Sequence, residues 1–441
     1  MSALAESAAL EHIHDLGSFV SASPSSFHTV AEAAARLKAA GFREARENQD
    51  WPVGPGSYFV QRDGALIAWV LPEDAQPTTG FAVLGAHTDS PSFKLKPKPT
   101  IGAHGWLQAG VEVYGGPLLN SWLDRELRLA GRLALRSGRT VLAATGPLLR
   151  LPQLAVHLDR AVNEGLTLNK QQHLQPVWGL GDPAQADVLA VLAQSAGVDP
   201  EEVGGYDVVV ADCQEPAVFG GAQEFFASGR LDNLSSVHAG LRALLDHHQA
   251  GAGGLTGGPI AVLAAFDHEE VGSATPSGAS GPFLADVLAR ISNSLGAGSE
   301  QWHRALASSV CLSADAGHAV HPNYPERHDP ANHPLLGGGP LLKINANQRY
   351  ATDAVGAALV ARLCAEQGIA YQEFVSNNNV PCGSTIGPLT ATRLGIRTVD
   401  VGVPLLSMHS AREMCSVTDP YHLSRLAGAF FRSTVLADFA G

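Results

Sequence analysis

The chain has 441 residues, of which 45% are hydrophobic and 16% are charged, and its formal net charge is −13. This composition is that of a globular protein rather than a disordered one, and the length exceeds what one hydrophobic core usually organises, so two domains are expected. The negative charge argues against a nucleic-acid partner, because affinity for nucleic acid comes mainly from cations on phosphates.

The first 20 residues contain Glu6, Glu11 and Asp15 and lack a basic stretch, so they predict an amphipathic helix rather than a signal peptide. No apolar stretch approaches the roughly 20 residues that a membrane-spanning helix needs, and we expect no membrane partner. The five cysteines form no CxxC pair and are odd in number, which is typical of reduced thiols. We therefore expect a cytoplasmic protein.

The elements that follow indicate an α/β domain. Residues 31–41 predict a helix that ends at Gly41, because glycine commonly follows the last turn of a helix. Residues 81–89 form an apolar run, typical of a buried strand, that ends in His87 and Asp89. An imidazole ligates zinc well when its other nitrogen is held, and Asp89 could hold it. A single His after a strand is more often an ordinary polar residue, so this pair alone leaves both interpretations open.

The middle of the chain, residues 95–226, carries no ligand motif. Its alternating runs at 105–116 and 125–135 predict strands with one solvated face. We expect this β-rich segment to be inserted into a discontinuous catalytic domain formed by residues 1–94 and 227–441.

A second candidate ligand begins the next predicted helix, residues 232–248, which has an apolar stripe. Asp232 precedes Asn233 there and is either a ligand or a helix cap. His247 and His248, at the other end, are interpreted as cations or polar groups that complement the helix carboxyl terminus rather than as metal ligands.

Two adjacent carboxylates follow the next strand. The glycine-rich stretch 251–258 lacks the GK[ST] ending of a phosphate loop and predicts a flexible loop. Residues 259–266 predict a central strand, beyond whose carboxyl end an α/β site would lie. Because neighbouring side chains point in different directions, one of Glu269 and Glu270 could bind a metal while the other takes a proton from water. An exposed acidic turn is the alternative.

Two further apolar runs end in polar residues of the same kind. Residues 309–315 end in Asp315, which could instead be a turn residue, and residues 398–409 end in His409. Oxygen and nitrogen ligands without thiolate suit zinc, manganese or cobalt, and a shared carboxylate suits two metal ions about 3.5–4 Å apart.

The remaining C-terminal segments complete the α/β pattern. Residues 351–368 predict an amphipathic helix, and residues 369–375 predict a strand. The loop 325–340 contains His328 and His333, which we interpret as part of a cover over the active site rather than as a further metal site.

Seven segments between His87 and Glu413 form an ordered set: GAHTDSPSFKLKP, SGRLDNL, FDHEEVGS, SADAGHAVHPNYPE, LLKINANQRYA, PCGSTIGP and SMHSARE. Together they resemble the aspartyl aminopeptidase family of di-zinc metallopeptidases. The resemblance implies an α/β fold, with a mixed-sheet metallopeptidase domain, helices on both faces of the sheet and an inserted β-rich dimerisation domain. It also implies a homo-dodecamer built from dimers.

The resemblance assigns a role to each candidate residue. Glu269 is the general base, and Asp89 orients His87. Asp232 bridges two divalent ions, which we expect to be zinc with manganese or cobalt as alternatives. The implied metal ligands are His87, Asp232, Glu270, Asp315 and His409.

On the substrate side, the resemblance implies that His318 and Lys343 contact the substrate and that His157 does so from a neighbouring subunit. The family usually has an Arg-Asn-Asp type sequence before PCG, whereas this chain has asparagines at 377–379. This departure bears on the substrate contacts and not on the metal ligands. Because Lys343, His318 and His157 could supply the local positive patch that an acidic side chain needs, we expect an aminopeptidase that releases N-terminal residues, preferably Asp or Glu, from peptides. A preference for neutral residues, an amidase acting on small amides, and a non-catalytic scaffold or assembly protein that kept the fold are the alternatives.

Overall fold

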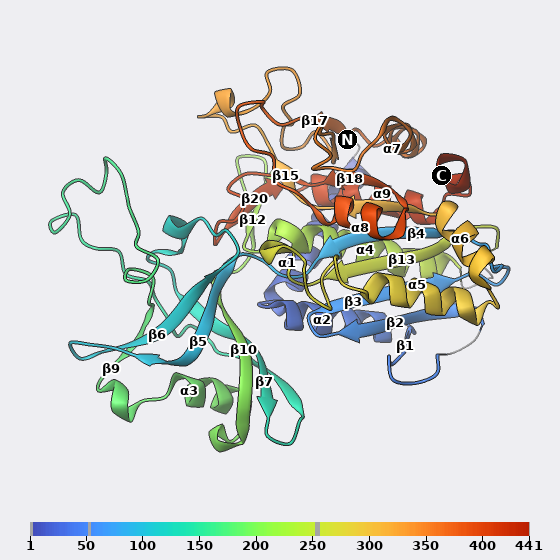
Figure 1. Cartoon of the computed structure of the whole chain (residues 1–441). Helices are drawn as coiled ribbons and strands as arrows, with labels where there is room; N and C mark the ends of the chain where they lie inside the picture. The colour runs from blue at the N-terminus through green and yellow to red at the C-terminus, as the bar shows by residue number, and fades with distance from the viewer. Residues whose placement is uncertain (1–2, 52–53, 252–255, 441) are drawn as a thin grey trace.

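The computed structural model describes residues 3–51, 54–251 and 256–440 and contains two sheets of different character (Figure 1). The larger sheet has nine strands, and its four central strands β13, β4, β14 and β18 are mutually parallel. In sheet order the strands are β1 (Arg43–Glu44), β2 (Gly56–Arg62), β3 (Ala65–Leu71), β13 (Ile260–Phe266), β4 (Phe81–His87), β14 (Val310–Ala314), β18 (Arg397–Gly402), β16 (Leu341–Lys343) and β17 (Gln372–Phe374).

This sheet is buried on both faces, because alternate residues of each central strand enter different cores. In β3, Leu66 and Ala68 belong to one core while Ile67 and Trp69 belong to the other. The first core is covered by α1 (Ala3–Ala22), α2 (Ser26–Ala39), α4 (Leu231–Ala250), α7 (Ala354–Gln367), α9 (Asp419–Arg432) and α10 (Leu436–Phe439). The second is covered by α5 (Phe283–Ser294), α6 (Ser299–Ala307) and α8 (Ile386–Leu394). The predicted fold class, a mixed α/β sheet with helices on both faces, is confirmed.

The parallel register brings the carboxyl ends of the central strands to one edge. Phe266 of β13 pairs with His87 of β4, and Ala314 of β14 pairs with Val401 of β18. The polar residues that follow these strands therefore emerge side by side, as the sequence predicted.

The second sheet forms a separate unit with its own hydrophobic core (Figure 1). Its strands, in sheet order, are β8 (Thr140–Ala144), β7 (Leu127–Leu135), β10 (Val203–Asp212), β5 (Ser92–Ile101), β6 (Trp106–Tyr114) and β9 (Val177–Leu180), and α3 (Val188–Ser195) packs on them. We call this the six-stranded unit and the remainder the nine-stranded unit. The proposed domain boundaries at 94/95 and 226/227 stay a prediction.

Two small sheets lie beside the ends of the central strands. One contains β11 (Ala217–Phe219), β12 (Phe225–Ser228) and β20 (Glu413–Ser416), and the other contains β15 (Gly317–His318) and β19 (Pro404–Leu405). Within the described residues, no helix is long and apolar enough to cross a membrane.

The histidines at the end of α4 differ from the prediction. His247 is buried, and burial lowers its pKa to about 4, so it is neutral rather than a cation at the helix terminus. His248 instead contacts the hydroxyl of Ser57 and the carbonyl of Ala40 through its two ring nitrogens. The predicted flexible loop 251–258 lies in part outside the described residues.

Candidate metal centre

His87 ends strand β4 and belongs to a buried triad with two carboxylates. Its Nε2 lies 3.3 Å from Oδ1 of Asp232 and 3.5 Å from Oδ1 of Asp315. Its Nδ1 lies 3.0 Å from the carbonyl oxygen of Asp89 and 3.4 Å from the Asp89 carboxylate. These contacts hold the imidazole so that Nε2 faces the two other carboxylates, as a metal-ligating histidine requires.

A second triad uses the other oxygen of Asp232. Oδ2 of Asp232 lies 3.4 Å from Nε2 of His409, and that nitrogen lies 3.6 Å from Oε2 of Glu270. Asp232 therefore presents one oxygen to each triad, which is the arrangement of a carboxylate shared between two sites. The ring of His409 is held by a contact of 3.0 Å between its Nδ1 and the carbonyl of Gly116.

The residues fit zinc in both distance and chemistry. With metal–ligand bonds of roughly 2.0–2.1 Å, two ligands of one tetrahedral zinc ion lie about 3.4 Å apart. The four nitrogen–oxygen separations within the triads are 3.3, 3.5, 3.4 and 3.6 Å. In addition, Oδ1 of Asp232 and Oε1 of Glu270 are buried and have no hydrogen-bond partner in the part of the chain that the structure describes. Orphaned carboxylate oxygens of this kind are expected where a cation binds.

Glu269 and Glu270 lie on a tight turn that Asp89 holds in place. Oδ1 of Asp89 accepts the backbone N–H of Glu269 at 3.0 Å, and Oδ2 accepts that of Glu270 at 3.2 Å. The hydroxyl of Tyr114 donates to the same carboxylate at 2.7 Å. Asp89 thus contacts His87 chiefly through its carbonyl, while its carboxylate mainly positions the two glutamates.

The acids around the triads are crowded and shielded from water. Burial raises the pKa of Glu269 to about 7, and burial together with the neighbouring Asp232 carboxylate raises the pKa of Glu413 to about 8. Burial also raises the pKa of Glu270 well above its ordinary value. Because a buried carboxylate is ionised only at a cost, this crowding favours a site that contains divalent cations.

Sequence reasoning missed three residues that position the predicted ligands. The buried carboxylate of Glu413 accepts the backbone N–H of Asp232 at 2.9 Å and that of His409 at 2.7 Å. Tyr114 and Gly116 come from the six-stranded unit and contact Asp89 and His409, respectively. The sequence signal for this close approach was the Gly115-Gly116 pair. The backbone passes so near the metal ligands there that a Cβ at Gly115 would lie only 3.0 Å from Cβ of Glu270.

Beside the triads, a cavity of about 260 Å³ is lined by His318, His328, Tyr350, Asn377 and Cys382, among others. The amide of Asn377 donates to the backbone carbonyls of Glu326 and His328, so the loop 325–340 borders this cavity. No group of metal-ligating side chains in the described part of the chain includes His328 or His333.

Two other predicted substrate residues lie away from this cavity surface. Lys343 is buried, and its Nζ donates to the carbonyl of Ala316 at 2.7 Å and lies 5.2 Å from the centre of the Tyr350 ring. His157 is exposed on the long segment between β8 and β9, which projects from the six-stranded unit (Figure 1). Within the described residues of its own subunit, His157 is not among those that surround the triads.

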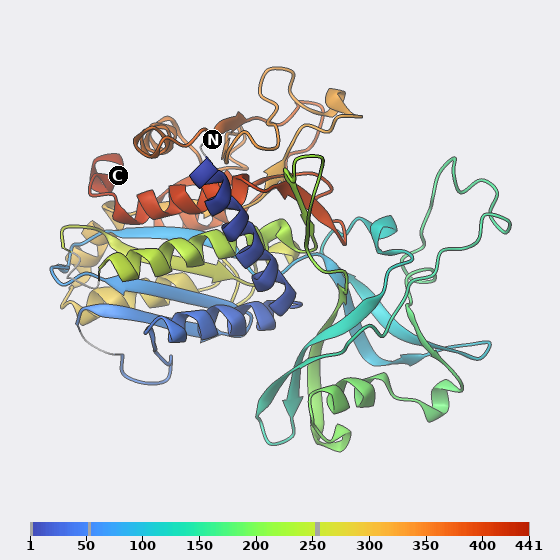
Figure 2. The same cartoon turned by 180° about the vertical axis from the view of Figure 1, so that it is seen from behind.

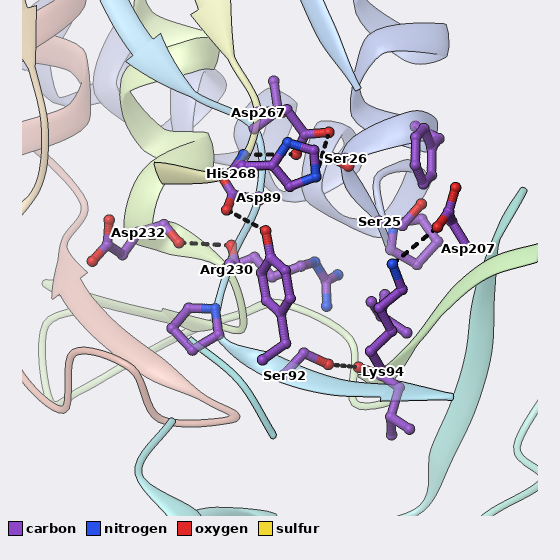
Figure 3. Close-up of a pocket in the computed structure, with 18 of the residues that line it drawn as sticks. Ser25, Ser26, Asp89, Ser92, Lys94, Asp207, Arg230, Asp232, Asp267 and His268 are labelled. Carbon is purple, nitrogen blue, oxygen red and sulfur yellow. Dashed lines mark hydrogen bonds and ion pairs between the residues drawn. The ribbon is translucent and has the colours of Figure 1, made fainter. Parts of the chain in front are cut away.

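A second cavity, of about 300 Å³, has Asp89 and Asp232 in its wall together with residues of both units. Figure 3 shows Asp267 and His268 on one wall and the ion pair of Lys94 with Asp207, at 2.9 Å, on another. Residues of both units therefore line the space next to Asp89 and Asp232.

The chain is similar to known proteins both in sequence and in fold. The model of a family described as aminopeptidase I zinc metalloprotease (M18) matches residues 19–431. The chain is 54% identical over 424 residues to a probable M18 family aminopeptidase 2 of Streptomyces coelicolor, covering 96% of this chain and 98% of that protein.

Among solved structures, one described as the Ape4 and Nbr1 complex contains a similar chain, with a TM-score of 0.92, 36% identity, and coverage of 99% of this chain and 87% of the other. The Saccharomyces mApe1 dodecamer is also similar, with a TM-score of 0.85, 29% identity, and coverage of 96% and 97%.

Proposed function

The chain belongs to the aminopeptidase I (M18) family of zinc metalloproteases and is a metallo-aminopeptidase, and from this premise we propose that it uses two metal ions to release N-terminal Asp and Glu from peptides. The observation that carries the two-metal proposal is the position of Asp232, whose carboxylate oxygens face different triads. A non-catalytic scaffold is not favoured, because every proposed ligand is present and the family is one of peptidases.

Each residue near the triads has a distinct proposed task. Two zinc ions held by His87, Asp232, Glu270, Asp315 and His409 would supply a water of lowered pKa and polarise the peptide carbonyl. Glu269 takes the proton of the attacking water and returns it to the departing amine. Asp89 keeps Glu269 within reach of this water, because its carboxylate accepts the backbone N–H of Glu269.

The buried ammonium of Lys343 supports the preference for acidic residues. Buried charges are normally paired, yet in the described structure Nζ of Lys343 has no carboxylate within ion-pair distance; it donates to the carbonyl of Ala316 and lies over the Tyr350 ring. The carboxylate of an N-terminal Asp or Glu bound in the cavity would supply the missing charge next to Tyr350, whose ring lines the cavity and lies 5.2 Å from Nζ, with His318 on the same wall. If Lys343 serves only the structure, the enzyme would prefer neutral residues instead.

A peptide assay with one substitution separates these possibilities. We would measure the release of N-terminal Asp, Glu, Leu and Ala from matched short peptides by zinc-loaded enzyme, its Lys343→Met variant and, as a control, Lys38→Met on the distant helix α2. The proposal predicts fastest release of Asp and Glu, with the preference lost only in Lys343→Met. Faster release of Leu and Ala, unchanged in Lys343→Met, would contradict the acidic preference and leave the peptidase chemistry intact.

We also propose that subunits associate through the six-stranded unit, so that His157 reaches the site of a neighbour. Large apolar side chains are exposed on this unit, among them Leu158 and Leu180, which are 75% and 74% exposed. The yeast relative forms a dodecamer, which supports a homo-oligomer here. The five cysteines are all free thiols, which is consistent with the proposed cytoplasmic location.

A further inference from the structure

A cavity remote from the strand ends that carry the metal ligands is lined by arginines from two helices. It has a volume of about 530 Å³ and lies between α1, α4 and α9, which pack together on the helical face seen in Figure 2. Arg242 comes from α4, whereas Arg425 and Arg432 come from α9. A volume of several hundred Å³ is typical of sites for small molecules.

The arginines of α9 are not neutralised by the protein. In the described structure, neither Arg425 nor Arg432 has a carboxylate within ion-pair distance, and the recorded hydrogen bond of Arg425 is to the carbonyl of Gln367. Of the three acids that line this cavity, Asp246 pairs with Arg242 at 3.0 Å and Asp15 pairs with Arg36 at 2.8 Å, whereas the exposed Glu11 has no ion pair within the described residues. The guanidinium groups of α9 therefore keep donors free for an incoming anion, because each has five N–H groups.

A glycine in the middle of α9 positions one of these groups. Gly428 is buried, and a Cβ at this residue would lie 3.2 Å from Nη1 of Arg432. Glycine is a poor helix former, so its presence in a helix interior needs a local reason. Here it lets the guanidinium of Arg432 lie across the helix beside the cavity.

His12 of α1 provides an independent indication of a ligand. It lines the same cavity and is only 8% exposed, and its Nε2 has no hydrogen-bond partner among the described residues. Its ring packs against that of His238, with ring centres 4.8 Å apart. An unpartnered buried polar atom of this kind calls for a polar partner, either a water molecule or a ligand atom that reaches it from the cavity.

We propose that this cavity binds a small anion with two or more acidic groups, either a phosphate ester or a polycarboxylate. Arg425 and Arg432 would each form paired hydrogen bonds to an acidic group, which the planar guanidinium favours. A turn of the His12 ring towards the cavity would bring its buried Nε2 to a further oxygen of the same ligand. Nothing in this proposal depends on the peptidase chemistry at the strand ends.

The test is calorimetric titration of the intact zinc-loaded protein at constant ionic strength. Fructose 1,6-bisphosphate and tricarballylate serve as probes of the two ligand sources, and the one that binds with submillimolar affinity identifies the source. Because charge-assisted hydrogen bonds are strong, Arg432→Gln is expected to weaken binding about tenfold or more. His12→Phe and Gly428→Ala should also weaken binding, whereas Glu11→Gln should tighten it by removing a repulsive charge.

Arg304→Gln on α6 is the matched control, because Arg304 is exposed and distant from this cavity in the fold. Melting temperature and aminopeptidase activity would verify that each variant is folded. Absence of saturable binding of both probes overturns the proposal. It is also overturned if Arg304→Gln weakens binding as much as Arg432→Gln, or if the α9 variants and Glu11→Gln all bind like the unaltered protein.

Discussion

At the scale of single residues, the metal ligands depend on groups that never touch the metals. Glu413 receives the backbone N–H groups of both Asp232 and His409, and thereby fixes one ligand of each triad. Such outer partners set the direction of a ligand, and their loss typically lowers metal affinity about 10- to 100-fold.

Glu413→Gln should therefore weaken zinc binding by about one to two orders of magnitude, with kcat falling in parallel. The amide nitrogen of glutamine would face a backbone N–H and cannot accept it, so one hydrogen bond is lost. Competition with a chromophoric chelator measures the affinity, with Glu300→Gln on exposed α6 as the control. Equal affinity of Glu413→Gln and the control would show that Glu413 does not hold the ligands.

At the scale of elements, the end of α4 should make the fold sensitive to acid. The pKa of His247 falls from an ordinary value near 6.5 to about 4 because of burial, so the folded state binds fewer protons than the unfolded state between these values. The contribution of neutral His247 to the free energy of unfolding is therefore fully present above pH 6.5 and is lost as the pH falls towards 4. At pH 5 the loss from this residue is about 2 kcal/mol.

Urea unfolding at pH 7 and pH 5 tests this prediction. His247→Leu keeps the packing against Phe431 and removes the titrating ring, so its free energy of unfolding should fall less on acidification than that of the unaltered protein. Burial also lowers the pKa of His28 to about 4. His28 is present in both proteins, so its share of the loss in free energy of unfolding is the same in the two. Identical losses in the two proteins would contradict the assignment to His247.

The sequence predicted the metal ligands best where an apolar run ends directly in a polar residue. The apolar runs that end at His87 and Asp315 marked strands whose carboxyl ends adjoin, because β4 and β14 pair in parallel. The run predicted to end in His409 is not one strand, since β18 ends at Gly402 and His409 follows the short strand β19. The burial of His247 could not be foreseen, because it depends on the packing of α9 against α4. The contact of Gly116 with His409 joins residues 293 positions apart in different units, and no local pattern encodes it.

At the scale of the whole molecule, the six-stranded unit contributes to the metal centre and also presents apolar surface. Exposed apolar patches of soluble proteins commonly mark interfaces. Leu158→Asp should reduce the molar mass measured by light scattering, because a buried charge is unfavourable in an apolar interface. Val355→Asp, at an exposed site on α7, is the control. An unchanged mass in Leu158→Asp would exclude this surface as an essential contact.

The central claim, that Asp232 joins two metal sites in one subunit, is tested most directly by zinc content per subunit, measured by plasma mass spectrometry after dialysis. We predict two zinc ions in the unaltered protein, two in Glu269→Gln with kcat reduced by orders of magnitude, and fewer than two in Asp232→Asn. One zinc ion in the unaltered protein, or two in Asp232→Asn, would contradict the claim.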